Sequence, residues 1–169
     1  MTYATQNLRT IRQDLRGQRV NFASIEFIAL TVLLFVSRRF YAGKPALGQE
    51  ELASHLDVPP RLLRTILEEL TRLGFVVETT QEIDGSGYQP ARALEKIRLH
   101  DVIRGLAVDG TDYSHLRQNR ERGVVASLEE TLQRAEREAL ADMTLRDLVL
   151  KTEESADQEA ELDGAESPV

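Results

Sequence analysis

The hydrophobic residues between positions 59 and 74 recur every three or four places, which is the spacing of one face of an α-helix. Proline is well placed at the start of such a helix, because the first turn does not use its backbone N–H groups in intrahelical bonds. Gly74 can end the helix, because glycine readily adopts a left-handed conformation. The predicted buried face consists of Leu63, Ile66, Leu67, Leu70 and Leu73.

A shorter helix is predicted before this one and a hairpin after it. The segment GQEELASHL carries Leu52 and Leu56 four residues apart, on one face of a short helix. The segments FVVETT and GYQPA are typical of short strands, and Asp84 and Gly85 between them form a strong turn pair. The order is that of a winged helix-turn-helix. The predicted fold is therefore mainly α with a small β-hairpin wing, flanked by additional N- and C-terminal helices.

The most apolar segment, Phe22 to Val36, has about 15 residues with Glu26 inside it. A bilayer-spanning helix needs roughly 20 apolar residues. A buried core helix from about Ser24 to Tyr41 is therefore favoured over a membrane span.

Three further helices are predicted after the wing. The first, in LEKIRLHDVIRGL, carries Val102, Ile103 and Leu106. A long amphipathic helix follows a polar loop, and its apolar face either completes the core of the monomer or pairs with a second copy. The residues of this candidate dimer helix are Val125, Leu128, Leu132 and Ala135. A short last helix begins with a capping box at Thr144 and Asp147.

Four arginines in the N-terminal segment repeat at helical spacing beside an apolar stripe. The segment either packs its apolar stripe on the domain or uses its arginines to contact a membrane surface or phosphates. These candidate contacts are Arg9, Arg12, Arg16 and Arg19.

Charge is distributed unevenly along a chain of 169 residues with a net charge of −7. Residues 151–169 hold one basic and seven acidic residues and almost no large apolar side chain, which predicts a disordered tail. We expect a basic amphipathic arm (1–20), the winged helix-turn-helix domain (21–108), a loop and C-terminal helices that pack on it or dimerise (109–150), and the acidic tail (151–169).

No set of residues with the spacing of a catalytic or metal-binding site is evident in the sequence. The chain contains no cysteine, which excludes cysteine-ligated metal sites and thiol nucleophiles. The histidines His55, His100 and His115 lack partners at ligand spacing. We therefore expect no enzyme activity, no catalytic or metal-binding residue, no cofactor and no small-molecule substrate. A nuclease would need acid–base or metal-binding groups that this sequence does not offer.

The second helix of the helix-turn-helix is where DNA is read in this fold, in the major groove. Its predicted exposed face mixes basic residues with Glu68 and Glu69, and no Lys or Arg occurs from Gly74 to Ala91. Carboxylates near phosphates repel, so we expect weak DNA binding or none, with Leu62 exposed as a protein contact. The candidate nucleic-acid or partner surface comprises Arg61, Leu62, Arg64, Thr65, Arg72 and Arg92.

Residues 22–150 resemble the C-terminal cytoplasmic region of the YihY/BrkB membrane proteins. The motifs that carry the resemblance are YQPAR at residues 88–92 and TLRDL at residues 144–148. The resemblance implies a non-enzymatic interaction module at the cytoplasmic face of the inner membrane, with a protein or the membrane surface as its partner.

The same core is similar to Rrf2-type transcription regulators. Their wing exit reads close to GGYxLAR and their next helix resembles ITLxDVI, which corresponds here to Ile97–Ile103. This chain has Pro90 where that family prefers leucine, has about 20 extra residues before the first domain helix, and lacks the three cysteines of the cluster-binding members. This resemblance implies the alternative function, a dimeric DNA-binding regulator in the cytoplasm.

Overall fold

The computed structural model of the chain describes residues 22–81, 85–107 and 119–165. Its central element is α2 (Phe22–Tyr41), formed by the most apolar segment of the sequence. Ala29, Val32 and Leu33 on this helix are fully buried, which confirms the prediction of a core helix. None of the helices in the described ranges is both long and apolar enough to cross a membrane.

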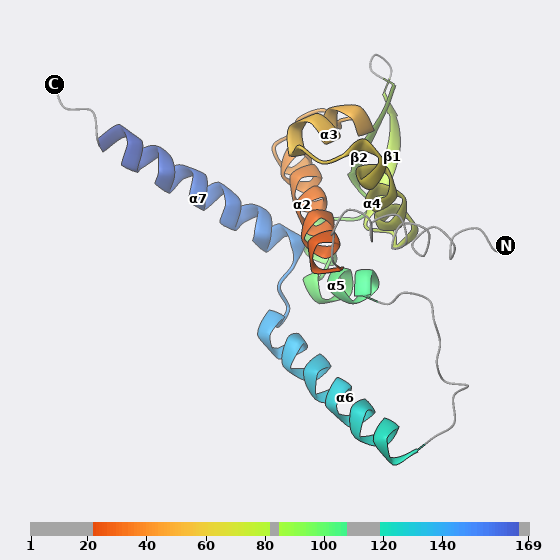
Figure 1. Ribbon diagram of the computed structural model, residues 1–169. Coiled ribbons are helices and arrows are strands. Elements are labelled where there is room, and N and C mark those ends of the chain that lie inside the picture. Colours follow the sequence, from red (N-terminus) through yellow and green to blue (C-terminus); the bar gives the residue numbers. More distant parts are fainter. Residues whose placement is uncertain (1–21, 82–84, 108–118, 166–169) are drawn as a thin grey trace.

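The helix-turn-helix consists of α3 (Gln49–Leu56) and α4 (Pro60–Arg72). Asp57 between them takes a left-handed conformation with φ 50°, which turns the chain sharply. Pro60 occupies the first position of α4, and Gly74 follows the helix with φ 75°, as the sequence predicted. In the structure α4 contacts α3, α2 and β1 (Figure 1), so three sides of this helix meet other elements.

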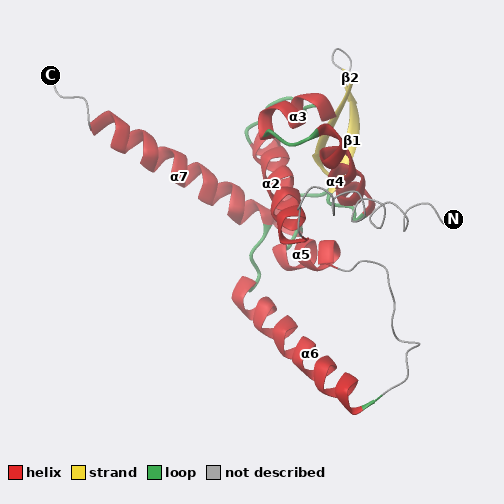
Figure 2. Cartoon of the chain, viewed as in Figure 1, coloured by secondary structure: helices red, strands yellow, loops and turns green. Residues whose placement is uncertain are grey.

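The wing is a two-stranded antiparallel hairpin of β1 (Val76–Gln81) and β2 (Gly85–Pro90), as Figure 2 shows. The register pairs Val76 with Pro90 and Glu78 with Tyr88. The predicted turn pair lies partly outside the described residues, because residues 82–84 are not described. The fold class is therefore as predicted, mainly helical with a hairpin wing.

The segment after the wing differs from the single helix that was predicted. It divides into a short 3-10 helix, η1 (Leu94–Lys96), and α5 (Leu99–Ala107). Extended backbone at Ile97 separates them, because the next residue, Arg98, forms an antiparallel bridge with Thr144. A partner more than forty residues away in sequence thus interrupts the helix.

Two long helices, α6 (Arg120–Leu140) and α7 (Leu145–Ala165), extend from this body (Figure 1). The predicted capping box of α7 is confirmed: the Thr144 N–H and hydroxyl both donate to Asp147 Oδ2 at 2.7 Å. Leu145 and Val149 of α7 are buried in the core, and Arg38 of α2 forms an ion pair with Glu153.

Residues 151–165, for which a disordered tail after a short last helix was predicted, continue α7 in the structure. Alanine and glutamate, which recur here, are good helix formers, and a helix already nucleated by a cap and a buried first turn extends at little cost. Residues 166–169, and the predicted arm at residues 1–20, lie outside the described residues.

Candidate nucleic-acid interface

The exposed face of α4 begins at its N-terminus. Arg61 and Arg64 are exposed there, and Thr65 is half-buried with its hydroxyl donating to the Arg61 carbonyl at 3.2 Å. These three predicted residues do lie together on one helix face. Within the described part of the chain, Arg61 forms no ion pair, so its guanidinium is available to a ligand.

Leu62 was predicted to be exposed as a protein contact, and this prediction is wrong. Its side chain is 8% exposed and belongs to the hydrophobic core. The reason is that α4 packs against α2, α3 and β1 together, so its buried face is wider than the stripe of a helix that contacts one neighbour.

The two glutamates of α4 are paired with arginines of the same helix. Arg64 Nε donates to Glu68 Oε1 at 3.1 Å, and Arg72 Nε donates to Glu69 Oε2 at 2.8 Å. Glu69 is half-buried rather than exposed as predicted. Each carboxylate is therefore screened by a neighbouring guanidinium, and the face of α4 is close to neutral except at Arg61.

Arg92, another predicted contact, holds the root of the wing. Its Nε donates to the Gly74 carbonyl at 3.1 Å, and its guanidinium lies over the Phe75 ring, 5.5 Å from the ring centre. A cation held over an aromatic face gains from the quadrupole of the ring. This arrangement gives Arg92 a structural role at the end of α4, away from the exposed N-terminal turns.

The wing lies against the helix-turn-helix through Leu47, Gly48 and Tyr88. The Tyr88 N–H donates to the Leu47 carbonyl at 3.0 Å, which adds a third short segment to the hairpin. A Cβ atom on Gly48 would stand 3.1 Å from the Ser86 carbonyl oxygen, so a larger residue would push the wing outward. The need for glycine at this point was not evident in the sequence; its only local signal was the capping-box spacing to Glu51.

Tyr88 also marks where the wing and α4 meet. Burial raises the pKa of Tyr88, and the nearby carboxylates of Glu78 and Glu68 raise it further, while Arg64 opposes them. Tyr88 therefore lies near two carboxylates, one from the wing and one from α4, and near the Arg64 guanidinium. The acidic tip predicted at Glu82 and Asp84 lies outside the described residues.

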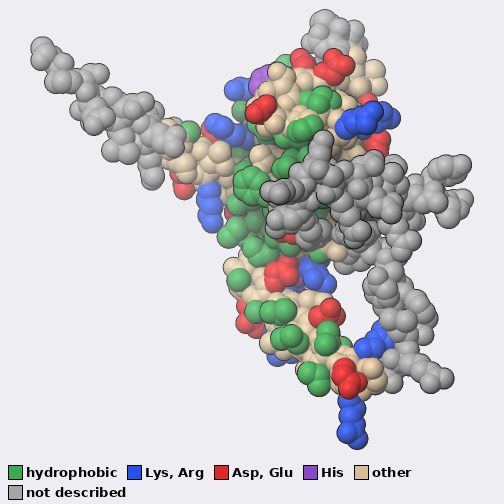
Figure 3. Space-filling model, viewed as in Figure 1, with side chains coloured by type: hydrophobic (Ala, Val, Ile, Leu, Met, Phe, Trp, Pro, Cys, Tyr) green, Lys and Arg blue, Asp and Glu red, His purple; other side chains and the backbone are tan. Residues whose placement is uncertain are grey.

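A second exposed surface lies on α6, which has no buried residue within the described chain. Its apolar residues form the green stripe visible on the lower helix in Figure 3. Leu128 is 57% exposed and Leu132 is 61% exposed, so the helix does not complete the monomer's core. The candidate dimer residues Val125, Leu128, Leu132 and Ala135 are all exposed on it.

Metal-binding groups of three or more His, Cys, Asp or Glu side chains do not occur among the residues that the structure describes. His55 is exposed, with its Nδ1 2.9 Å from the Glu51 carbonyl and its ring 5.9 Å from that of Phe35. His100 lies beside Asp101, and His115 falls outside the described residues, as do the arginines Arg9, Arg12, Arg16 and Arg19.

Several solved structures share this fold, and one of them is described as a global cysteine regulator. IscR of T. potens is 19% identical with a TM-score of 0.60 and covers 82% of this chain and 93% of its own. The global cysteine regulator CymR (YrzC) of B. subtilis is 18% identical with a TM-score of 0.55, covering 79% and 97%. CymR of Staphylococcus aureus is 17% identical with a TM-score of 0.51, covering 75% and 95%. At these identities the likeness shows the fold alone.

No curated protein matches the chain. The comparisons also give no support to the YihY/BrkB resemblance, which was drawn from the two short motifs YQPAR and TLRDL. The family model described as "Rrf2: Iron-dependent Transcriptional regulator" matches residues 27–151. Since that match spans most of the chain, this protein belongs to the Rrf2 family.

Proposed function

We propose that this protein is a homodimeric DNA-binding transcription regulator that places α4 in the major groove. The observation that carries the proposal is the exposed N-terminal face of α4, with Arg61 and Arg64 beside a wing that is hydrogen-bonded to the helix-turn-helix. In this fold the N-terminal residues of the second helix reach base edges and phosphates. Arginine is the commonest partner of guanine there.

The acidic residues that led us to expect weak binding or none are largely compensated. Glu68 is held by Arg64, and Glu69 by Arg72, so neither presents an isolated negative charge to a phosphate. On contact with DNA, Arg64 can exchange its exposed carboxylate partner for a phosphate. We therefore place DNA ahead of a membrane surface or a protein as the partner of this face.

The exposed apolar stripe on α6 supports a dimer. A monomer rarely leaves such a stripe on a long helix in water, because burying apolar surface is favourable. Two copies related by a two-fold axis bury the same stripe on both chains. They also present two α4 helices, which suits a DNA site made of two half-sites.

The iron named in the family description does not carry over to this chain. Clusters of iron and sulfur are held by cysteine thiolates, and the sequence has no cysteine. The described residues also offer no other group of metal ligands. The regulator that we propose therefore responds to something other than a cysteine-ligated cluster.

The test is fluorescence anisotropy of a labelled mixed-sequence duplex at about 50 and 200 mM salt, a range over which phosphate contacts lose affinity steeply. We expect binding at the lower salt that weakens at the higher. Arg61→Ala should weaken it and reduce the slope of log affinity against log salt by about 1.

The matched control is Arg146→Ala on α7, which Figure 1 places on the other side of α2 from α4. This variant should bind DNA as the parent protein does. Absence of binding at the lower salt, or equal losses in both variants, would contradict DNA recognition by α4.

A further inference from the structure

A hollow of about 330 Å³ lies where α5 begins and α6 ends. Sites for small ligands commonly start at about this volume. Five of the six side chains that line it are charged or titratable, and they come both from the start of α5 and from the end of α6. The lining residues are Arg98, His100, Asp101, Arg137, Ala141 and Asp142.

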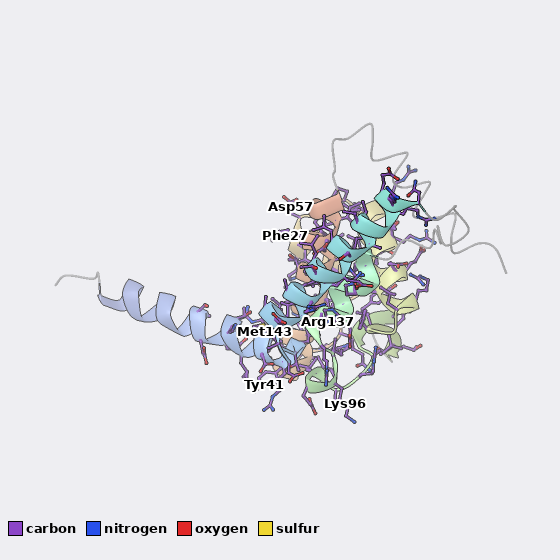
Figure 4. All side chains as sticks on the ribbon, turned by 90° about the horizontal axis from the view of Figure 1, so that it is seen from below. Phe27, Tyr41, Asp57, Lys96, Arg137 and Met143 are labelled. Atoms are coloured by element: carbon purple, nitrogen blue, oxygen red, sulfur yellow. The ribbon has the colours of Figure 1, made fainter. Side chains whose placement is uncertain are left out.

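The walls of this hollow are fixed by backbone hydrogen bonds. The Leu99 N–H donates to the Met143 carbonyl at 3.0 Å, and the Leu145 N–H donates to the Ile97 carbonyl at 2.8 Å. Figure 4 shows Arg137 on the last turns of α6, close to Met143 in the segment that leads into α7. The charged side chains therefore project from a junction that is already held in place.

Ala141, which ends α6 in this hollow, has φ 47° and ψ −128°. This region is left-handed and strained for any residue with a Cβ atom, and strain of this kind gathers at ligand sites and switches. The bend at Ala141 is what brings the end of α6 against the start of α5. The strained residue thus shapes the hollow itself.

The charges of the lining are balanced but only loosely paired. Arg98 is 3.4 Å from Asp142, and His100 Nδ1 is 3.6 Å from Asp101 Oδ1, and three of these four side chains are largely exposed. Among the described residues Arg137 has no ion-pair partner. Pairs of this kind contribute little on their own and can be exchanged for a ligand's charges.

This balance selects the chemical class of ligand. A simple anion would meet the carboxylates of Asp101 and Asp142, and a simple cation would meet the guanidiniums of Arg98 and Arg137. A small molecule with one charge of each sign satisfies both.

We propose that the hollow binds a free α-amino acid. Its carboxylate would be held by Arg137 and Arg98, and its ammonium group by Asp101. The proposal concerns ligand binding alone, and it stands whether or not α4 binds DNA.

The site stays open in the proposed dimer. Arg137 follows Leu128 by nine residues, which at about 100° per residue places the two side chains on opposite sides of α6. Pairing two copies through the apolar stripe therefore leaves the hollow accessible.

The experiment is thermal denaturation of the full chain with each of the twenty common amino acids in turn. At about ten times its Kd, a ligand should raise the Tm by about 3–6 °C. The N-acetylated and the carboxamide forms of the same amino acid, which each lack one charge, should give no shift. A shift with either single-charge form, or none with any amino acid, would overturn the proposal.

Two variants test whether the amino acid binds in this hollow. For each variant, calorimetric titration measures the affinity for the amino acid that stabilises the parent protein. Arg137→Gln and Asp101→Asn should each weaken binding at least about tenfold, because each removes a charged hydrogen bond. The control is Arg134→Gln, an exposed arginine of α6 outside the lining. Unchanged affinity in both test variants, or an equal loss in the control, would refute the site.

Discussion

At the scale of single residues, the start of α4 alternates sharply between solvent and core. Arg61 is exposed, while Leu62 and Leu63 beside it are both buried. The guanidinium that we assign to DNA is thus carried by a helix turn whose neighbouring side chains anchor the fold. Substitutions at Arg61 and at Leu62 should therefore affect different properties, DNA binding in the first case and stability in the second.

Leu62→Ala should lower the free energy of unfolding by about 2–5 kcal/mol, because it leaves a cavity in a packed core. Urea denaturation followed by circular dichroism measures this loss. Arg61→Ala, the neighbouring control, should change stability by less than about 0.5 kcal/mol, since surface substitutions seldom do more. A small effect at Leu62 would mean that its side chain lies in solvent after all.

At the scale of elements, α7 depends on the capping box at its start. The Thr144 hydroxyl, and then its N–H, donate to Asp147, and these bonds lower the pKa of that carboxyl. A lowered pKa in the folded state means that ionised Asp147 stabilises folding at neutral pH. That contribution disappears as the pH falls from the ordinary value of 3.8 through the lower value of the folded state.

Asp147→Asn should therefore make the Tm less dependent on pH below 3.8 than it is in the parent protein. Thermal denaturation followed by circular dichroism across that range checks this. Glu154→Gln on the same helix is the control, because the Glu154 side chain accepts no hydrogen bond from the described residues and should leave the pH profile as it was. Parallel profiles for parent and Asp147→Asn would contradict the role of the cap.

The elements that the sequence predicted well are those whose signals are local. Helical spacing, the proline at the start of α4 and the glycine after it located the winged helix without any long-range information. The break at Ile97 and the close approach of Gly48 to the wing depend on residues far away in sequence, so no local pattern could show them. For the candidate site, the face of α4 was predicted, but the pairing of its glutamates and the burial of Leu62 required neighbours to be placed.

At the scale of the whole molecule, the winged helix is a compact body, and α6 is the outlying surface that we propose for assembly. The helix contacts the body through α5, and its apolar stripe faces away from its own core. In the proposed dimer, this separate helical element would join the two DNA-binding bodies, so assembly and DNA reading could be disrupted independently.

Leu128→Glu combined with Leu132→Glu should convert the dimer to a monomer, because buried carboxylates without partners are costly. Light scattering measures the mass directly. Ala126→Glu, on the opposite side of α6, adds the same kind of charge outside the stripe and should leave the dimer intact. A parent protein that is monomeric at all concentrations, or a double variant that still dimerises, would contradict assembly through this stripe.

The outlying helices also have a hydrodynamic consequence. A helix of 21 residues such as α7 is about 30 Å long, which is about twice the radius of gyration, roughly 15 Å, of a compact chain of this size. With α7 projecting as Figure 1 shows, one chain diffuses as slowly as a larger sphere. A monomer would then elute from a sizing column early enough to be mistaken for a dimer, so elution volume would overstate its mass and shape must be separated from stoichiometry.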